Sequence, residues 1–141
     1  METAKKYLRK IREDEYAIAR LKERCNDLRF SLGASAIRYD KDKVQGTPRD
    51  VMSETMAEVF ELEDRMMKIQ ERLIDRRYEA ERIIRHMSDD IQQSALRLYY
   101  LDPALYSWGK VAYLIGKSEK YLIRQIHPDA LASFEQARKI V

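Results

Sequence analysis

Residues 107–126 read SWGKVAYLIGKSEKYLIRQI. Ser107 and Ser118 each precede a short run in which apolar residues recur at steps of three and four, the spacing of one face of an α-helix. Gly116 separates the two runs and can adopt the positive φ that a tight turn requires. The stretch therefore predicts two short helices, residues 108–115 and 118–126, joined by a tight turn.

The apolar residues of these two helices are expected to pack on a preceding helix at residues 88–101. They are Val111, Ala112, Ile115, Leu122 and Ile126. The second helix then has an outward side with side chains that can contact DNA, because arginine can bind guanine and glutamine can bind adenine with two hydrogen bonds each. The expected DNA-binding residues are Lys110, Lys117, Ser118, Lys120, Tyr121, Ile123, Arg124 and Gln125. The same spacing also fits a packed helical corner that binds no nucleic acid.

Two longer apolar stripes precede this stretch, each with heptad spacing and one polar interruption. The first, in residues 2–32, is Tyr7, Ile11, Ile18, Leu21, Cys25, Leu28 and Leu32, interrupted at Asp14. The second, in residues 50–87, is Val59, Leu62, Met66, Ile69, Leu73, Ala80, Ile83 and Met87, interrupted at Arg76. Heptad spacing keeps one seam of a helix facing a partner. We expect an antiparallel coiled-coil hairpin whose first helix ends at Gly33 and whose loop is 33–49.

A long helical hairpin followed by a smaller helical domain is the predicted fold, in the all-α class. Residues 86–141 hold only 7 Lys and Arg and 6 Asp and Glu, and aromatic residues become common there. The expected domains are therefore 1–87, a coiled-coil hairpin, and 88–141, a helix-turn-helix domain. Ser88 is expected to cap the first helix of the second domain. Pro128 is expected to shorten or kink the helix before it, since proline disfavours helical geometry at the preceding residue.

Composition excludes several classes of protein. The chain has 141 residues, of which 36% are charged, with a net charge of +3 and only 4 Gly and 3 Pro. We expect no membrane helix, because there is no apolar run near 18 residues. The single cysteine, Cys25, cannot form an internal disulfide and fits a cytoplasmic protein. Two helices bury only a narrow stripe each, so we expect a homo-oligomer, or docking of the hairpin on the C-terminal part.

Other site chemistry is not expected. His86 and His127 are far apart and lack a cysteine pair, so we predict no metal site and place each histidine at the surface or a helix end. No glycine-rich phosphate loop or nucleophile motif is present, and we expect neither an enzyme nor a cofactor. A group of aromatic residues is interpreted as core rather than as a platform for stacking bases. It comprises Tyr99, Tyr100, Trp108 and Tyr113.

The strings LRLYYLD (96–102) and SWGKVAYLIGKSEKYLIRQIHPDAL (107–131) resemble region four of sigma factors, a C-terminal helix-turn-helix. The run DKVQGTPRDVMSETMAEVFELEDRM (42–66) resembles the middle of small phage and prophage proteins that join a coiled coil to such a domain. This group is related to the RinA and ArpU late transcription regulators, and the resemblance covers about residues 5–135. Lys110 stands where sigma factors usually have glutamate, which argues against carrying over their promoter specificity.

The resemblance implies a sequence-specific, DNA-binding transcription regulator of phage or prophage type that acts on late genes in a bacterial host cell. Double-stranded DNA is the expected partner, and RNA polymerase is a second. One alternative is a protein-interaction adaptor that binds RNA polymerase and has little affinity for DNA. The other is a small-terminase-like DNA-packaging protein, although such proteins usually have the DNA-binding domain first, the reverse of the order expected here.

Overall fold

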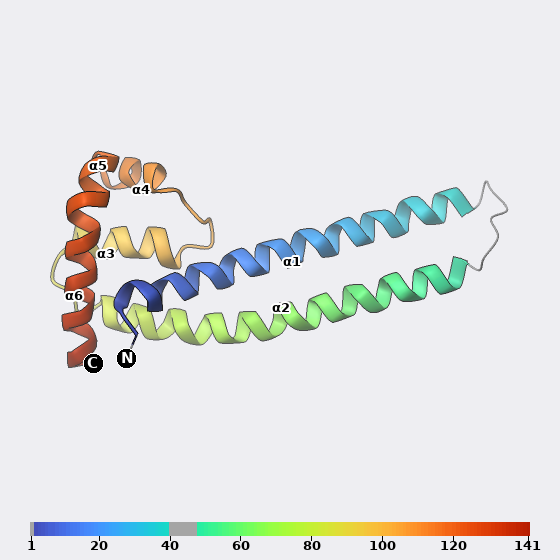
Figure 1. Cartoon of the computed structure of the whole chain (residues 1–141), viewed down its shortest axis with the longest axis horizontal. Helices are drawn as coiled ribbons and strands as arrows, with labels where there is room; N and C mark the ends of the chain where they lie inside the picture. The colour runs from blue at the N-terminus through green and yellow to red at the C-terminus, as the bar shows by residue number, and fades with distance from the viewer. Residues whose placement is uncertain (1, 40–47) are drawn as a thin grey trace. The chain divides into compact units, whose positions relative to one another are not determined.

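The computed structural model describes residues 2–39 and 48–141, and all regular structure in these ranges is helical (Figure 1). The all-α prediction is therefore confirmed. The elements are α1 (Ala4–Tyr39), α2 (Pro48–Ile84), α3 (Asp90–Leu96), η1 (Arg97–Leu101), α4 (Trp108–Ile115), α5 (Glu119–Tyr121), η2 (Leu122–Ile126) and α6 (His127–Ile140), where η1 and η2 are π-helical. Within these ranges, no helix has both the length and the apolar character needed to span a membrane.

The chain divides into two compact units, and both long helices contribute to each. Unit 1 comprises residues 1–16 and 72–141, and unit 2 comprises residues 17–71. This division does not coincide with the boundary expected between residues 87 and 88. The start of α1 belongs to unit 1 because it packs against α6: the Tyr7 and Phe134 rings lie 6.0 Å apart, and Arg138 donates a 2.9 Å hydrogen bond to the Glu2 carbonyl.

Unit 2 is an antiparallel pair of helical segments with a narrow apolar seam (Figure 1). Cys25, Val59 and Leu62 are buried along it, and the other stripe residues in this unit are half-buried. Exposed ion pairs flank the seam, with Arg24 3.3 Å from Glu58 and Arg29 paired with Glu63. The heptad stripes thus identify the buried side of both segments correctly.

The predicted helix end at Gly33 is wrong. The first helix, α1, continues through Gly33 to Tyr39, and α2 begins at Pro48 rather than at Asp50. A glycine inside a helix costs only about 1 kcal/mol relative to alanine, so it need not end one. Proline suits the first position of a helix, where its missing N–H is not needed. The remainder of the predicted loop, residues 40–47, lies outside the described residues.

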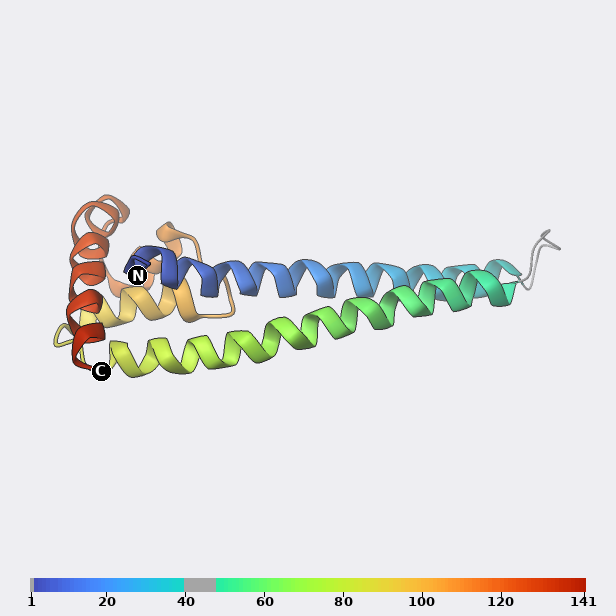
Figure 2. The same ribbon diagram turned by 60° about the horizontal axis from the view of Figure 1, so that its bottom comes forward.

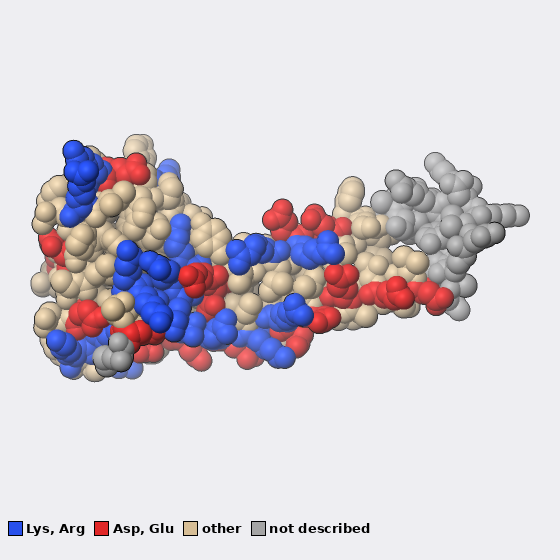
Figure 3. Space-filling model, viewed as in Figure 1, with Lys and Arg blue, Asp and Glu red and all other residues tan. Residues whose placement is uncertain are grey.

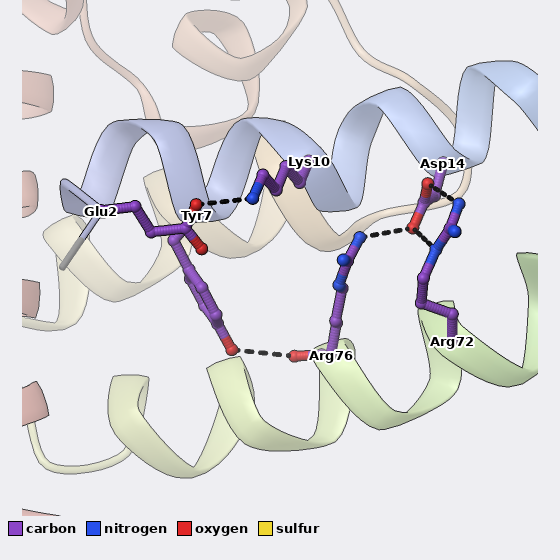
Figure 4. Close-up of polar contacts among 6 residues, drawn as sticks. All are labelled: Glu2, Tyr7, Lys10, Asp14, Arg72 and Arg76. Atoms are coloured by element: carbon purple, nitrogen blue, oxygen red, sulfur yellow. Dashed lines mark hydrogen bonds and ion pairs between the residues drawn. The ribbon is translucent and has the colours of Figure 1, made fainter.

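In unit 1, the two polar residues that interrupt the apolar stripes meet each other (Figure 4). Asp14 of α1 is buried, and its carboxylate accepts hydrogen bonds from Arg72 at 2.9 Å and Arg76 at 3.0 Å, both on α2. A buried carboxylate is costly unless it is paired and hydrogen-bonded. This contact therefore favours one alignment of α1 against α2 in unit 1.

The helices α3 to α6 begin and turn at residues that satisfy free backbone groups. As predicted, the Ser107 and Ser118 hydroxyls accept from the N–H groups of Lys110 (3.2 Å) and Tyr121 (3.1 Å), and Gly116 adopts a left-handed φ of 72°. The cap of α3 is Asp89, not Ser88, since the Asp89 carboxylate accepts from the Gln92 N–H. The predicted core is confirmed: Val111, Ala112, Leu122 and Ile126 are buried with Ala95 of α3, and Ile115 packs against them.

Of the two effects expected of Pro128, a shortened or a kinked helix before it, the shortening is wrong. The backbone is helical without a break from Glu119 to Ile140, and His127 itself has helical angles (φ −63°, ψ −49°). Figure 2 shows this segment leading through α6 to the C-terminus. The π turn η2 lies directly before Pro128. Local widening of the hydrogen-bond pattern accommodates a proline, which has no N–H to donate.

The two π turns change which residues face the core. Their hydrogen bonds join residues five apart, so residues four and five positions along from a buried residue both return to the same side. Tyr100 and Leu101, which come four and five residues after the buried Leu96, are thus both buried. In the same way, Leu122 is followed by Ile126 and His127, which leaves the three residues between them on the outside.

We predict that Asp14→Asn lowers the free energy of unfolding by about 1–3 kcal/mol, because the two arginines lose their buried counter-charge while remaining partly solvated. Asp64 offers the matched control, since its pair with Lys68 lies on the exposed side of α2. Asp64→Asn is expected to cost about 0.5 kcal/mol or less. Urea unfolding of both variants makes the comparison, and equal losses would contradict the role of Asp14.

Candidate nucleic-acid interface

The segment α5–η2 has one side fixed in the core of unit 1 and one side open to solvent. Leu122 and Ile126 are buried, as predicted. All of the residues expected to contact DNA are exposed: Lys110, Lys117, Ser118, Lys120, Tyr121, Ile123, Arg124 and Gln125. The predicted separation of buried and outward residues is therefore correct. The structure further divides the outward residues among three surroundings.

One edge of α5–η2 borders an acidic groove. Lys117, Tyr121 and Gln125 line it together with Asp89 and Asp129. The Gln125 side-chain amide donates a 2.8 Å hydrogen bond to the Asp129 carboxylate. This amide is therefore already engaged, and the neighbouring carboxylates oppose the approach of phosphate. Gln125 is consequently a weaker candidate for reading adenine than its position in the sequence suggests.

Lys120 and Arg124 form the middle row of the outward side. They are one helical turn apart and exposed, and neither forms an ion pair or side-chain hydrogen bond with another described residue. Figure 3 shows Lys and Arg side chains standing out over α5. Two such cations one turn apart, presented by a helix anchored on its opposite side, provide contacts suited to phosphate and guanine.

The other edge of α5–η2 borders a cleft of about 270 Å³, which we term the basic cleft. Its lining is Lys5, Arg9, Arg12, Tyr99, Tyr100, Trp108, Ile123 and His127, with no carboxylate among these residues. Figure 3 shows a dense group of Lys and Arg over the first turns of α1. Sequence reasoning confined to residues 107–126 missed this feature, because its cations come from the start of the chain.

Arg12 connects the basic cleft to the backbone of the helical domain. Its buried guanidinium donates to the carbonyls of Tyr99 and Tyr106, the latter at 2.8 Å, and lies 3.4 Å from the Leu105 carbonyl oxygen. Leu105 has a left-handed φ of 56°, a conformation that costs a non-glycine residue about 1 kcal/mol or more. Arg12 thus holds the strained connection between η1 and α4.

The aromatic side chains near the cleft cover one another. Tyr99 stacks on Trp108 with ring centres 3.6 Å apart, and the Arg12 guanidinium lies 4.0 Å from the Tyr99 ring centre on a cation–π contact. The His127 ring lies 4.5 Å from Trp108. These contacts use the ring faces that a base would need for stacking, which supports the interpretation of Tyr99, Tyr100 and Trp108 as core.

Tyr113 differs from the other aromatic residues, and its expected place in the core is wrong. The side chain is 76% exposed on α4, and the Lys110 ammonium lies 5.1 Å from its ring centre. Val111 and Ala112 face the core directly before it, so Tyr113 falls on the outer side of this short helix. Lys110 therefore belongs to the outer side of α4 and not to the row formed by Lys120 and Arg124.

His127 is buried at the first residue of α6, so the helix-end position expected for it is confirmed and the surface position is not, whereas His86 is exposed as predicted. The His127 Nε2 lies 2.7 Å from the Tyr100 hydroxyl. Burial, with repulsion from Lys5 in second place, lowers the pKa of His127 to about 4, and burial raises the pKa of Tyr100 above its ordinary range. At neutral pH the pair is therefore an uncharged histidine hydrogen-bonded to an uncharged tyrosine, and the histidine tautomer decides which of the two donates. Within the described residues, no cluster of three or more His, Cys, Asp or Glu side chains is arranged to hold a metal ion.

Comparison with known proteins identifies no relative of this chain. No protein-family model, no curated protein and no solved structure matches the chain. The chemistry available to this surface is therefore inferred from its own residues: an exposed cationic row on α5–η2 with a basic cleft on one edge and an acidic groove on the other.

Removal of the Arg12 guanidinium is expected to destabilise unit 1. Arg12→Met leaves buried carbonyls without their donor and is predicted to lower the free energy of unfolding by about 2–4 kcal/mol. Arg9→Met changes an exposed side chain one turn earlier and serves as the control, with an expected effect within about 0.5 kcal/mol. Urea unfolding followed by the single tryptophan, Trp108, measures both; a loss below 1 kcal/mol for Arg12→Met would contradict its anchoring role.

Acid is expected to weaken the fold through His127. The unfolded histidine, with its ordinary pKa near 6.5, takes up a proton before the folded one does, so stability falls as pH drops below about 6.5. Between pH 7 and pH 5 the expected loss is about 2 kcal/mol. Urea titrations of His127→Gln should show this pH dependence removed, whereas His86→Gln should retain it. A His127→Gln protein that still loses the same stability would refute the assignment.

Proposed function

We propose that this chain is a sequence-specific DNA-binding protein in which α4, the Gly116 turn and α5–η2 act as a helix-turn-helix. The segment α5–η2 enters the major groove, and α4 braces it against the DNA backbone. One observation carries the proposal: Lys120 and Arg124 stand exposed, in no ion pair with any other residue that the structure describes, on a segment whose other side is fixed by buried Leu122 and Ile126.

Arg124 is the proposed base-reading residue. Its planar guanidinium can donate two hydrogen bonds to O6 and N7 of guanine, whereas the Lys120 ammonium acts as a point charge suited to phosphate. The acidic groove formed with Asp89 and Asp129 lies on the opposite edge from the basic cleft. DNA is therefore repelled from one edge and attracted to the other, which favours one orientation of the duplex on α5–η2.

Regulation of transcription, and of late phage or prophage genes in particular, is proposed from the resemblance to sigma region four and to the RinA and ArpU regulators. Such a role brings the DNA-bound protein near RNA polymerase. The narrow seam of unit 2, with only a few buried side chains, supports pairing with a second copy of the chain. A paired protein would contact two half-sites on the DNA.

An adaptor that binds RNA polymerase is the second candidate. Tyr113 is 76% exposed and its neighbour Leu114 is 45% exposed on α4, which gives this helix an apolar surface suited to a protein partner. Binding of polymerase by wild-type protein but not by Tyr113→Ser, with weak and equal binding to all DNA sequences, would favour this candidate over the first.

Selection from a pool of random-sequence duplexes, followed by fluorescence anisotropy at several salt concentrations, tests the proposed function. A selected duplex should bind about 10³-fold or more tightly than its scrambled version, and affinity should fall steeply with salt. Failure to enrich any sequence, with equal weak binding to selected and scrambled duplexes, would contradict sequence-specific recognition.

Arg124→Ala is predicted to cost about 1–3 kcal/mol of binding to the selected duplex and to relax specificity at one base pair. The reason is the loss of one bidentate contact to guanine. Arg20→Ala, which removes another exposed arginine, from unit 2, is expected to leave affinity and specificity unchanged. Anisotropy against duplexes altered at each position measures both, and an equal loss on every sequence would assign Arg124 to phosphate instead of a base.

A further inference from the structure

The basic cleft contains positive charge that the fold does not use. Arg12 is committed to backbone carbonyls, but Lys5 and Arg9 are exposed and form no ion pair or side-chain hydrogen bond with other described residues. Lys10 on the same helix differs from them, because it pairs with Glu2 at 2.6 Å (Figure 4). Lys5 and Arg9 therefore leave an uncompensated positive site at the mouth of a defined cavity.

The chemistry of the lining selects an anionic group rather than a nucleobase. Both sides of Tyr99 are occupied, by Arg12 and by Trp108, and His127 approaches Trp108. An incoming base would find no free ring on which to stack. A tetrahedral phosphate needs only convergent cationic donors, and arginine and lysine supply these.

The position of the cleft indicates where such a phosphate comes from. Ile123 lines the cleft and also belongs to the outward side of α5–η2, next to Arg124. A duplex held by α5–η2 thus has backbone next to the cleft. The cations come from α1, so this contact lies outside residues 107–126, which carry the helix-turn-helix pattern.

We propose that Lys5 and Arg9 bind a phosphate group in the basic cleft, and that the sugar–phosphate backbone of the DNA contacted by α5–η2 supplies it. This inference deepens the proposed function and rests on it for the source of the phosphate. The contact positions the protein on the duplex without reading bases, since phosphate contacts carry no direct sequence information. Free phosphate is the other source of the same chemistry.

The first test measures anisotropy of the full chain on selected and scrambled duplexes from about 0.05 to 0.3 M salt. Arg9→Ala and Lys5→Ala should each weaken binding about 5- to 10-fold at 0.1 M salt, equally on both duplexes, and reduce the slope of log affinity against log salt by about 1. Lys6→Ala removes a charge from the same turn of α1 without touching the cleft, and it should change neither quantity. Losses equal to those of Lys6→Ala, or no losses, would overturn the proposal.

A second test does not depend on DNA. Trp108 is the only tryptophan, so its indole N–H gives one assignable NMR signal within the cleft lining. Inorganic phosphate, exchanged for chloride at constant ionic strength and pH 7, should shift this signal saturably in wild-type and Lys6→Ala protein but not in Arg9→Ala protein. If phosphate shifts the signal in this way but the protein binds no DNA, the proposed function is refuted and the cleft remains a site for free phosphate. No saturable shift, or an equal shift in Arg9→Ala, would overturn the phosphate site.

Discussion

The guanidinium of Arg12 is the contact on which the rest of unit 1 depends. It is buried, it binds the carbonyls of Tyr99 and Tyr106, and it lies against the Tyr99 ring. These contacts tie the start of α1 to the connection between η1 and α4. Because α1 is held there, Lys5 and Arg9 come to line the same cleft as Ile123. One buried cation therefore links the stability of the fold to the charge of its candidate binding surface.

Local signals in the sequence predicted much of this structure. Serine caps, the left-handed glycine and the 3.6-residue period placed α4, the Gly116 turn and the buried side of α5–η2 correctly. The failures have physical causes. The π turn η2 returns both Ile126 and His127 to the core, so His127 is buried at the start of α6 instead of lying at the surface. A tolerated glycine and a tolerated proline do not break helices at Gly33 and Pro128. Long-range contacts, such as the ion pair between Asp14 and Arg76, leave no local signal in the sequence.

The candidate interface combines three surfaces that chain order separates. The row of Lys120 and Arg124 supplies cations, the basic cleft extends positive charge along one edge, and Asp89 with Asp129 places negative charge on the other. A net charge of only +3 conceals this asymmetry. Electrostatic steering depends on how charge is arranged over a surface rather than on its total, so a mildly basic chain can still present a well-defined face to DNA.

Hydrogen exchange of the full chain, free and bound to a duplex selected for binding, tests the central claim most directly. If α5–η2 and the cleft form the DNA contact, amide exchange should slow in residues 117–126 and in the first turns of α1. Exchange in residues 17–33 and 50–71 of unit 2 should stay the same, except where two copies of the chain contact each other. Protection confined to the exposed side of α4 or to unit 2, with none in residues 117–126, would contradict the proposed DNA-binding surface.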